Sequence, residues 1–149
     1  MYKKILVPLD GSPRAERILP YVEEIAVKFG SRIVFMQIVE PNVSMVSPYD
    51  IAPYNIGEET KRHVSEARTY LAGIEGEFRA KGLEAKSCVE DGPVVPTILD
   101  VAEREDAELI AMASHGYRGF ARFVYGSVAA DVLHRANAPM LILRIEPTD

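Results

Sequence analysis

The chain has a single cysteine, no long apolar run and no excess of positive charge. One cysteine excludes an intramolecular disulfide and a metal site of several cysteines, and Cys88, in the strand-like stretch AKSCVED, is predicted to be a packed, inert thiol. No stretch approaches the roughly 18 apolar residues of a membrane span, and MYKKILVPLDGS is no secretory leader. A formal net charge of −5 gives no excess of positive charge with which to bind nucleic acid or an anionic membrane. We therefore expect a cytoplasmic protein that binds neither.

Common signatures of nucleotide binding and catalysis are also missing. Neither GxxxxGK[ST] nor GxGxxG occurs in the sequence. The three histidines, His63, His115 and His134, do not have metal-ligand spacing, and no nucleophile, base and orienting group can be assembled. The sequence therefore predicts no robust catalysis, and it leaves the presence of a metal open.

What the sequence does contain is an alternation of strand and helix patterns. Apolar runs predict strands at residues 4–9, 32–39, 108–113 and 139–144, and residues 84–90 are predicted to form one more short strand, the third of five. Apolar residues at helical spacing predict helices between them, around residues 18–29, 58–82, 95–105 and 128–136. Such an alternation implies right-handed crossovers. We expect residues 1–149 to form one α/β domain, an open and mainly parallel sheet with helices on both faces.

Prolines carry three local predictions. Ser12 followed by Pro13 suits the N-cap and first position of a helix. Pro20 lies inside the same helical pattern and is expected to kink the helix or tighten its first half. Residues 40–57 contain three prolines and are expected to form a long irregular segment, of the kind that serves as a lid or a partner surface.

The predicted topology indicates where a ligand would bind. Open α/β sheets bind ligands beyond the carboxyl ends of their strands, where the strand order reverses. If the first strand is central, the loops that begin at Asp10, Glu40 and Ser114 converge on one crevice. Asp10 could accept hydrogen bonds from a ribose hydroxyl or a base amine, or it could cap the next helix. The pattern alone leaves both roles open.

The stretch ASHGYRGFARFVYGS, residues 113–127, enters the same crevice. Gly126 and Ser127 stand where the last helix begins, and a helix N-terminus offers unpaired N–H groups to an anion. The loop before them holds two glycines and two arginines: Gly116, Gly119, Arg118 and Arg122. Glycines let a backbone approach a phosphate closely, but strand-to-helix loops contain glycine and serine for structural reasons as well. Spacing alone favours a phosphate cradle and a plain connection equally.

Three stretches, KKILVPLDGSPRAERIL, GPVVPTILDVAE and ASHGYRGFARFVYGSVAADVLHRANAPMLILR, resemble the universal stress protein family, and the resemblance covers essentially the whole chain. Its most specific motif is Gly-x2-Gly-x9-Gly-Ser/Thr. Gly116, Gly126 and Ser127 match this motif, and Ala113 replaces the first glycine. The resemblance implies a Rossmann-like, adenine nucleotide alpha hydrolase-like fold with a five-stranded parallel sheet in the order 3-2-1-4-5. It also implies a homodimer formed through the last strand.

ATP binding, with Mg²⁺ or Mn²⁺ at the phosphates, follows from the same resemblance. Carried over residue by residue, the base and ribose would lie against Pro8, Asp10, Ile38, Met112 and Ala113. The phosphates would lie against Gly116, Gly126, Ser127 and Val128. The methyl group of Ala113 costs about 1–3 kcal/mol of binding if the site cannot shift. Because Ala113 ends a strand, where φ is negative, we expect a mild loss and retained ATP binding.

Three functions fit these residues. The first is an ATP-binding stress-response regulator or nucleotide-dependent switch with an unknown protein partner. A slow ATPase or self-phosphorylating protein would use the same cradle, although the sequence shows no evident base and no Walker-type lysine. The third is an interaction module in which Ala113 marks the loss of ATP binding.

Overall fold

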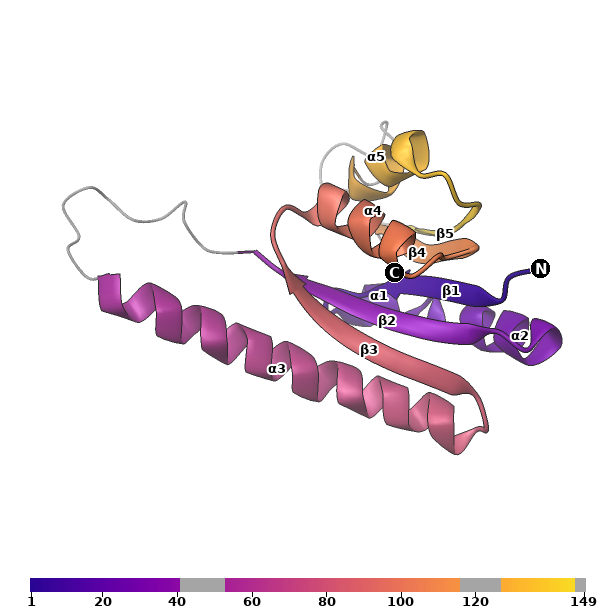
Figure 1. The fold of residues 1–149 in the computed structure, drawn as a ribbon, viewed down its shortest axis with the longest axis horizontal. Coiled ribbons are helices and arrows are strands. Elements are labelled where there is room, and N and C mark those ends of the chain that lie inside the picture. The colour runs from indigo at the N-terminus through magenta and orange to yellow at the C-terminus, as the bar shows by residue number, and fades with distance from the viewer. Residues whose placement is uncertain (41–52, 116–126, 147–149) are drawn as a thin grey trace.

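The computed structural model describes residues 1–40, 53–115 and 127–146 (Figure 1). Within them one parallel sheet has the order β3-β2-β1-β4-β5, as expected. Its strands are β1 (Lys4–Pro8), β2 (Arg32–Val39), β3 (Glu84–Asp91), β4 (Leu109–His115) and β5 (Met140–Ile145). The chain builds β1, β2 and β3 outward on one side and then returns to place β4 and β5 on the other. The strand order therefore reverses between β1 and β4.

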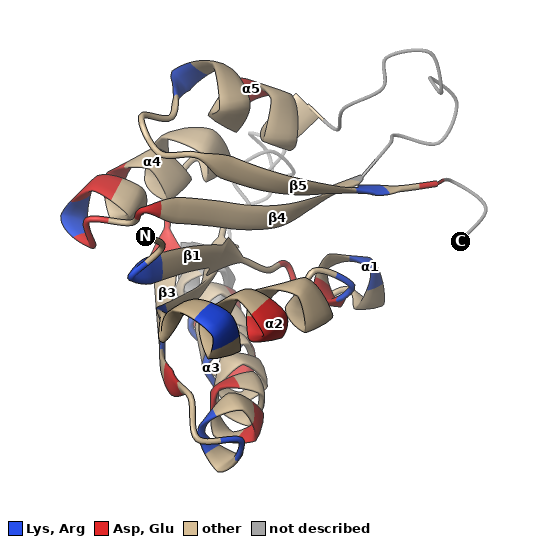
Figure 2. Cartoon of the chain, turned by 90° about the vertical axis from the view of Figure 1, so that its right-hand side faces the viewer, with Lys and Arg blue, Asp and Glu red and all other residues tan. Residues whose placement is uncertain are grey.

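Helices cover both faces of the sheet (Figures 1 and 2). On one face lie α1 (Pro13–Glu16), α2 (Leu19–Phe29) and α3 (Pro53–Ala80), and on the other lie α4 (Val94–Arg104) and α5 (Ser127–Arg135). Side chains of a strand alternate between these faces: Ile5 and Val7 of β1 pack toward α1–α3, whereas Leu6 packs toward α4 and α5. Since both faces are covered, the central strands are apolar throughout, which explains the uninterrupted runs in the sequence.

The first predicted helix is divided in two. Ser12 is the N-cap of α1, as expected, and its hydroxyl accepts a hydrogen bond from the Ala15 N–H. The predicted kink at Pro20 is instead a complete break before it, because α1 ends at Glu16 and α2 begins at Leu19. A proline lacks the N–H of an interior helix position but is tolerated in a first turn, so the break precedes Pro20.

The third helix begins earlier than the sequence predicts. The irregular segment was expected to reach residue 57, but residues 53–57 are helical and α3 starts at Pro53. Proline suits a first helical position, because its missing N–H would have no helical partner there. The rest of that predicted segment, residues 41–52, lies outside the described residues. The interior glycines Gly73 and Gly76 do not interrupt the helix, and an added Cβ at either would face open space.

Cys88 lies on β3 and is half-buried against the cluster under α4 and α5. Burial, followed by the nearby Glu90 carboxylate, raises the pKa of this thiol. A thiol with a raised pKa is a poor nucleophile near neutral pH. The structure thus agrees with the prediction of a packed, inert cysteine.

Candidate functional site

The carboxyl ends of β1 and β4 separate where the strand order reverses. β1 pairs with β2 over its whole length, up to Pro8 opposite Met36, but pairs with β4 only at Ile5–Leu109 and Leu6–Ile110. Beyond this point β4 continues to His115 along β5 alone. The loss of pairing and the reversal of strand order coincide, and this is the position at which open α/β sheets bind ligands.

The turn after β1 fixes Asp10 at this edge. Oδ1 of Asp10 accepts hydrogen bonds from the Ser12 backbone N–H, at 2.9 Å, and from the Ser12 hydroxyl, at 2.6 Å. Gly11 between them has a φ of +83°, a conformation that favours glycine. Since Ser12 caps α1, the alternative in which Asp10 is the cap is excluded. Asp10 instead orders the turn and presents an exposed carboxylate at the edge.

Ile38 contributes backbone groups to the same edge. The Leu9 N–H donates to the carbonyl of Met36 at 2.8 Å, so the backbone groups of Met36 face β1. Residues two apart on a strand face the same neighbour, and Ile38 therefore directs its N–H and C=O toward the line of β1. Because β1 has ended opposite Met36, no β1 residue pairs with Ile38. Its side chain packs toward α4 and α5.

Met112 and Ala113 line the β4 side of the switch point. Both are buried, at 6% and 7% exposure, and Ala113 pairs with Leu143 as a regular strand residue. The only described non-glycine residues with positive φ are Tyr2 and Asp106, so Ala113 has the negative φ that its strand position predicts. An alanine is therefore not strained where the family motif has a glycine.

The beginning of α5 completes the described part of the predicted site. Ser127 is the first residue of α5 and is exposed, while Val128 is half-buried against the cluster under α4 and α5. Gly116 and Gly126 lie outside the described residues, as do Gly119, Arg118 and Arg122. The structure brings seven of the nine predicted residues to the carboxyl edge of the sheet: Pro8, Asp10, Ile38, Met112, Ala113, Ser127 and Val128.

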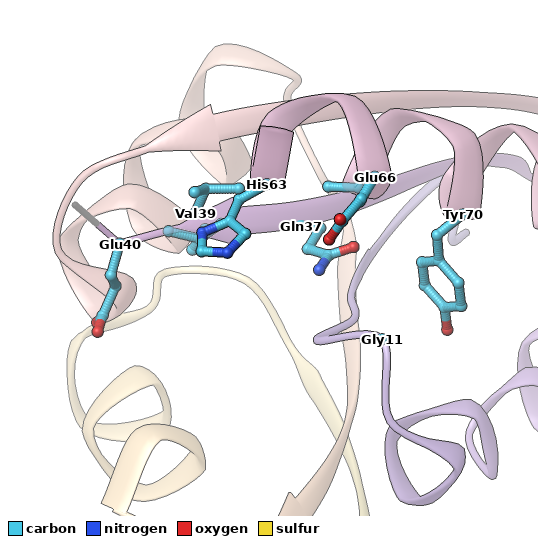
Figure 3. Close-up of a pocket in the computed structure, with 9 residues that line it drawn as sticks. Gly11, Gln37, Val39, Glu40, His63, Glu66 and Tyr70 are labelled. Carbon is cyan, nitrogen blue, oxygen red and sulfur yellow. The ribbon is translucent and has the colours of Figure 1, made fainter. Parts of the chain in front are cut away.

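A polar crevice beside this edge was missed by the sequence reasoning (Figure 3). The crevice, of about 480 Å³, is lined by Gly11, Gln37, Ile38, Val39, Glu40, His63, Glu66, Ala67 and Tyr70, and we call it the α3 crevice. Its four α3 residues follow one another at spacings of three, one and three, which places them on one helix face. The apolar stripe of α3 continues through Ala67, and the missed signal was the polar residues His63, Glu66 and Tyr70 that flank it.

Metal and membrane sites were searched over the same residues. Within residues 1–40, 53–115 and 127–146, no group of three histidine, cysteine, aspartate or glutamate side chains is arranged to hold a metal ion. In that part of the chain, every helix is too short or too polar to cross a membrane.

A parallel five-stranded sheet in this order, helical on both faces and open at a switch point, defines a Rossmann-like α/β protein. A model of the universal stress protein family matches residues 1–144, and the chain belongs to that family. The family resemblance noted in the sequence is confirmed.

Known relatives match nearly the whole chain. Universal stress protein MJ0577 of Methanocaldococcus jannaschii is 26% identical over 157 residues, which cover 97% of this chain and 96% of that protein. Its solved structure has a TM-score of 0.83 at 25% identity and covers 99% of both chains. The universal stress protein of Archaeoglobus fulgidus, solved in complex with dAMP, has a TM-score of 0.58 at 27% identity and covers 95% of this chain and 97% of its own. Some structural relatives thus bind nucleotides.

Proposed function

We propose that this chain is an ATP-binding universal stress protein that serves as a nucleotide-dependent switch in a stress response. The observation that carries the proposal is the gathering of Asp10, the unpaired edge of Ile38 and the N-terminus of α5 around one switch point. The dAMP complex of the Archaeoglobus relative supports an adenine nucleotide as the class of ligand.

The backbone of Ile38 suits the adenine base. Its N–H and C=O are one donor and one acceptor beyond the end of β1, and adenine offers an acceptor at N1 beside a donor at its exocyclic amine. A guanine presents these two groups in the opposite order, so the same backbone pair favours ATP over GTP. Pro8 and Met112 border this position from β1 and β4, and the Asp10 carboxylate is placed to accept from ribose hydroxyls.

The phosphates are assigned to the start of α5. The first N–H groups of a helix lack helical partners and carry the positive end of the helix dipole, which favours an anion. Ser127 adds an exposed hydroxyl at this position, and Mg²⁺ or Mn²⁺ would accompany the phosphates. The methyl group of Ala113 is already packed in an unstrained strand, which supports only a mild loss of affinity.

The test is calorimetric titration of nucleotide-stripped protein with ATP and Mg²⁺. Ser127→Ala is expected to weaken ATP binding roughly tenfold, the loss of one charge-assisted hydrogen bond. Gly126→Val is expected to weaken it further, because a β-branched side chain blocks close backbone approach. Ser65→Ala, an exposed serine on α3, is the matched control and leaves affinity unchanged. An absence of ATP binding at millimolar concentration would contradict the proposal and favour the interaction module.

We also propose that two copies associate through β5. This edge strand pairs only with β4 within the described sheet, and its apolar residues Met140, Leu141, Ile142 and Leu143 are all only half-buried. An apolar strand with unpaired backbone groups is suited to pairing with a second copy. Sedimentation velocity over a range of protein concentrations is expected to show a dimer, and a monomer at every concentration would refute it.

A further inference from the structure

Tyr70 of α3 contacts α1 beside the α3 crevice. Its half-buried ring packs against the core on the α1–α3 face of the sheet, and it lines the crevice together with Gly11 (Figure 3). Its hydroxyl hydrogen-bonds to the carboxylate of Glu16, the last residue of α1. A polar contact therefore joins the long helix α3 to the single helical turn that follows β1.

Tyr70 is the donor in this contact. Burial raises the pKa of Tyr70, and the charge of Glu16, the hydrogen bond to its carboxylate and the charge of Asp10 add to this effect. The hydroxyl therefore keeps its proton at neutral pH and donates it to Glu16, and hydrogen bonds to a charged acceptor are the stronger kind. Because the charge of Asp10 acts on the same hydroxyl, Tyr70 lies near both ends of the segment from Asp10 to Glu16.

The segment between these two carboxylates is one connected unit. Asp10 accepts hydrogen bonds from the N–H and the hydroxyl of Ser12, and that hydroxyl accepts one from the Ala15 N–H at 3.2 Å, one residue before Glu16. The buried side chain of Ala15 packs α1 against the core, but apolar contacts are not directional. A displacement of Glu16 is therefore passed along α1 and its cap to Asp10.

We propose that Tyr70 is a positioning residue for the nucleotide: through Glu16 and α1 it holds the Asp10 carboxylate in place for the ribose hydroxyls. The inference rests on the proposed function, which assigns those hydroxyls to Asp10. A hydrogen bond weakens steeply when its acceptor leaves a narrow range of distance and angle. Loss of the Tyr70 hydroxyl therefore weakens the contacts that Asp10 makes to the sugar and spares those made to the base and the phosphates.

The probes are ATP and 2′,3′-dideoxy-ATP, which share base and triphosphate and differ in the ribose hydroxyls. Calorimetry with Mg²⁺ on nucleotide-stripped protein is expected to show that Tyr70→Phe, which keeps the ring, weakens ATP binding roughly fivefold and leaves dideoxy-ATP binding unchanged. Tyr21→Phe, at an exposed position on α2, is the matched control and keeps wild-type affinity for both nucleotides. Equal weakening of both nucleotides, or of neither, would overturn the proposal.

Substitutions of Glu16 test the other side of the contact. Glu16→Gln and Glu16→Ala both remove the charge, but glutamine keeps an oxygen that accepts a hydrogen bond from Tyr70. Glu16→Gln is expected to retain the wild-type preference for ATP over dideoxy-ATP, and Glu16→Ala to reduce this preference roughly fivefold. Since the preference is a ratio between two triphosphates, a change of charge near the phosphates cancels. Equal preferences in the two Glu16 variants would overturn the role of this contact.

The wild-type titrations separate failure of this inference from failure of the proposed function. Wild-type protein that binds no ATP at millimolar concentration contradicts the proposed function and this inference with it. Wild-type protein that binds ATP and dideoxy-ATP equally tightly leaves nucleotide binding standing and contradicts the positioning role of Tyr70. Thermal unfolding of each variant, measured beside the titrations, shows that the affinities belong to folded protein.

Discussion

The two ends of the strands are held together in different ways: the amino edge, where the strands begin, and the carboxyl edge, where they end. At the amino edge, ion pairs join neighbouring elements: Arg32–Glu84 at 2.6 Å, Lys86–Glu105 at 2.8 Å and Lys4–Glu105 at 3.6 Å. The backbone adds to them, with Arg32 N–H donating to Lys3 and Glu108 N–H donating to Lys4. Figure 2 shows charged residues gathered near the N-terminus at this edge.

The carboxyl edge has fewer links of this kind and more unused polar groups. β1 and β4 part after two residue pairs, Ile38 has no β1 partner, and Oε1 of Gln37 is buried without a partner among the described residues. Burial raises the pKa of Tyr70 well above its usual range, and the charge of Glu16, a hydrogen bond to its carboxylate and the charge of Asp10 add to this effect, so the hydroxyl stays protonated. The contrast indicates that the amino edge secures the sheet while the carboxyl edge is left available for ligands.

The core between the edges should produce the largest effect. Phe35 is fully buried on β2 and its ring meets that of Phe78 edge-on at 5.0 Å. Phe35→Ala is expected to lower the free energy of unfolding by about 3–5 kcal/mol, through lost burial and the cavity left behind. Urea denaturation measures this loss, with Tyr21→Ala, an exposed aromatic on α2, as the control that changes little. A loss in Phe35→Ala no larger than in the control would refute the assigned core.

Substitution of Gly11 tests whether the turn at the carboxyl edge contributes to the stability of the fold. Gly11→Ala is expected to cost about 1–2 kcal/mol of unfolding free energy, because alanine is strained at a φ of +83°. Space is not the cause, since the added Cβ would make an ordinary contact with Gln37. The same exchange at Gly73, exposed inside α3, should stabilise by about 0.5–1 kcal/mol.

Opposite signs for these two variants, measured by thermal unfolding, would show that backbone conformation governs both. Gly11→Ala should also weaken ATP binding, because the turn positions Asp10. Equal changes in the free energy of unfolding for Gly11→Ala and Gly73→Ala would mean that the turn does not need its left-handed conformation. Gly11 would then not contribute to the stability of the carboxyl edge.

The sequence predicted the central strands well because they are apolar runs buried on both faces, as Ile33, Val34, Phe35 and Met36 of β2 show. Helix boundaries were less certain, since Pro20 and Pro53 fit either a break or a first turn and only tertiary packing decides between them. Seven predicted site residues come together because they lie near the carboxyl ends of strands or at the start of the helix that follows β4, and the topology fixes where these ends meet.

The α3 crevice could not be predicted in the same way. Gln37 reads as one polar residue in a buried strand, and His63, Glu66 and Tyr70 read as ordinary polar positions of a long helix. They line one crevice because α3 packs across the end of β2, which is a property of tertiary packing. Local patterns contain no information about such a contact between residues far apart in the chain.

The smallest predicted effect belongs to the amino edge. The hydrogen bond from Lys86, together with the charges of Lys86 and Lys4, lowers the pKa of Glu105, whose side chain is 14% exposed. A depressed folded-state pKa stabilises above the unfolded value of about 4.3, and the contribution is lost as pH falls through the folded value. Glu105→Gln should therefore lower the free energy of unfolding at pH 7 by about 0.5–1 kcal/mol, and the gap to wild type should close in acid.

Urea unfolding across this pH range, with the exposed Glu103→Gln as the control, measures the gap. ATP affinity should stay at its wild-type value in Glu105→Gln, because the proposed nucleotide site does not include the amino edge. In acid, Glu105 of the wild type is neutral, as the introduced glutamine is at every pH. A difference in unfolding free energy that persists in acid would therefore assign the effect to packing. A change in ATP affinity would show instead that the two edges are coupled through the sheet, and the separation of stability from binding would fail.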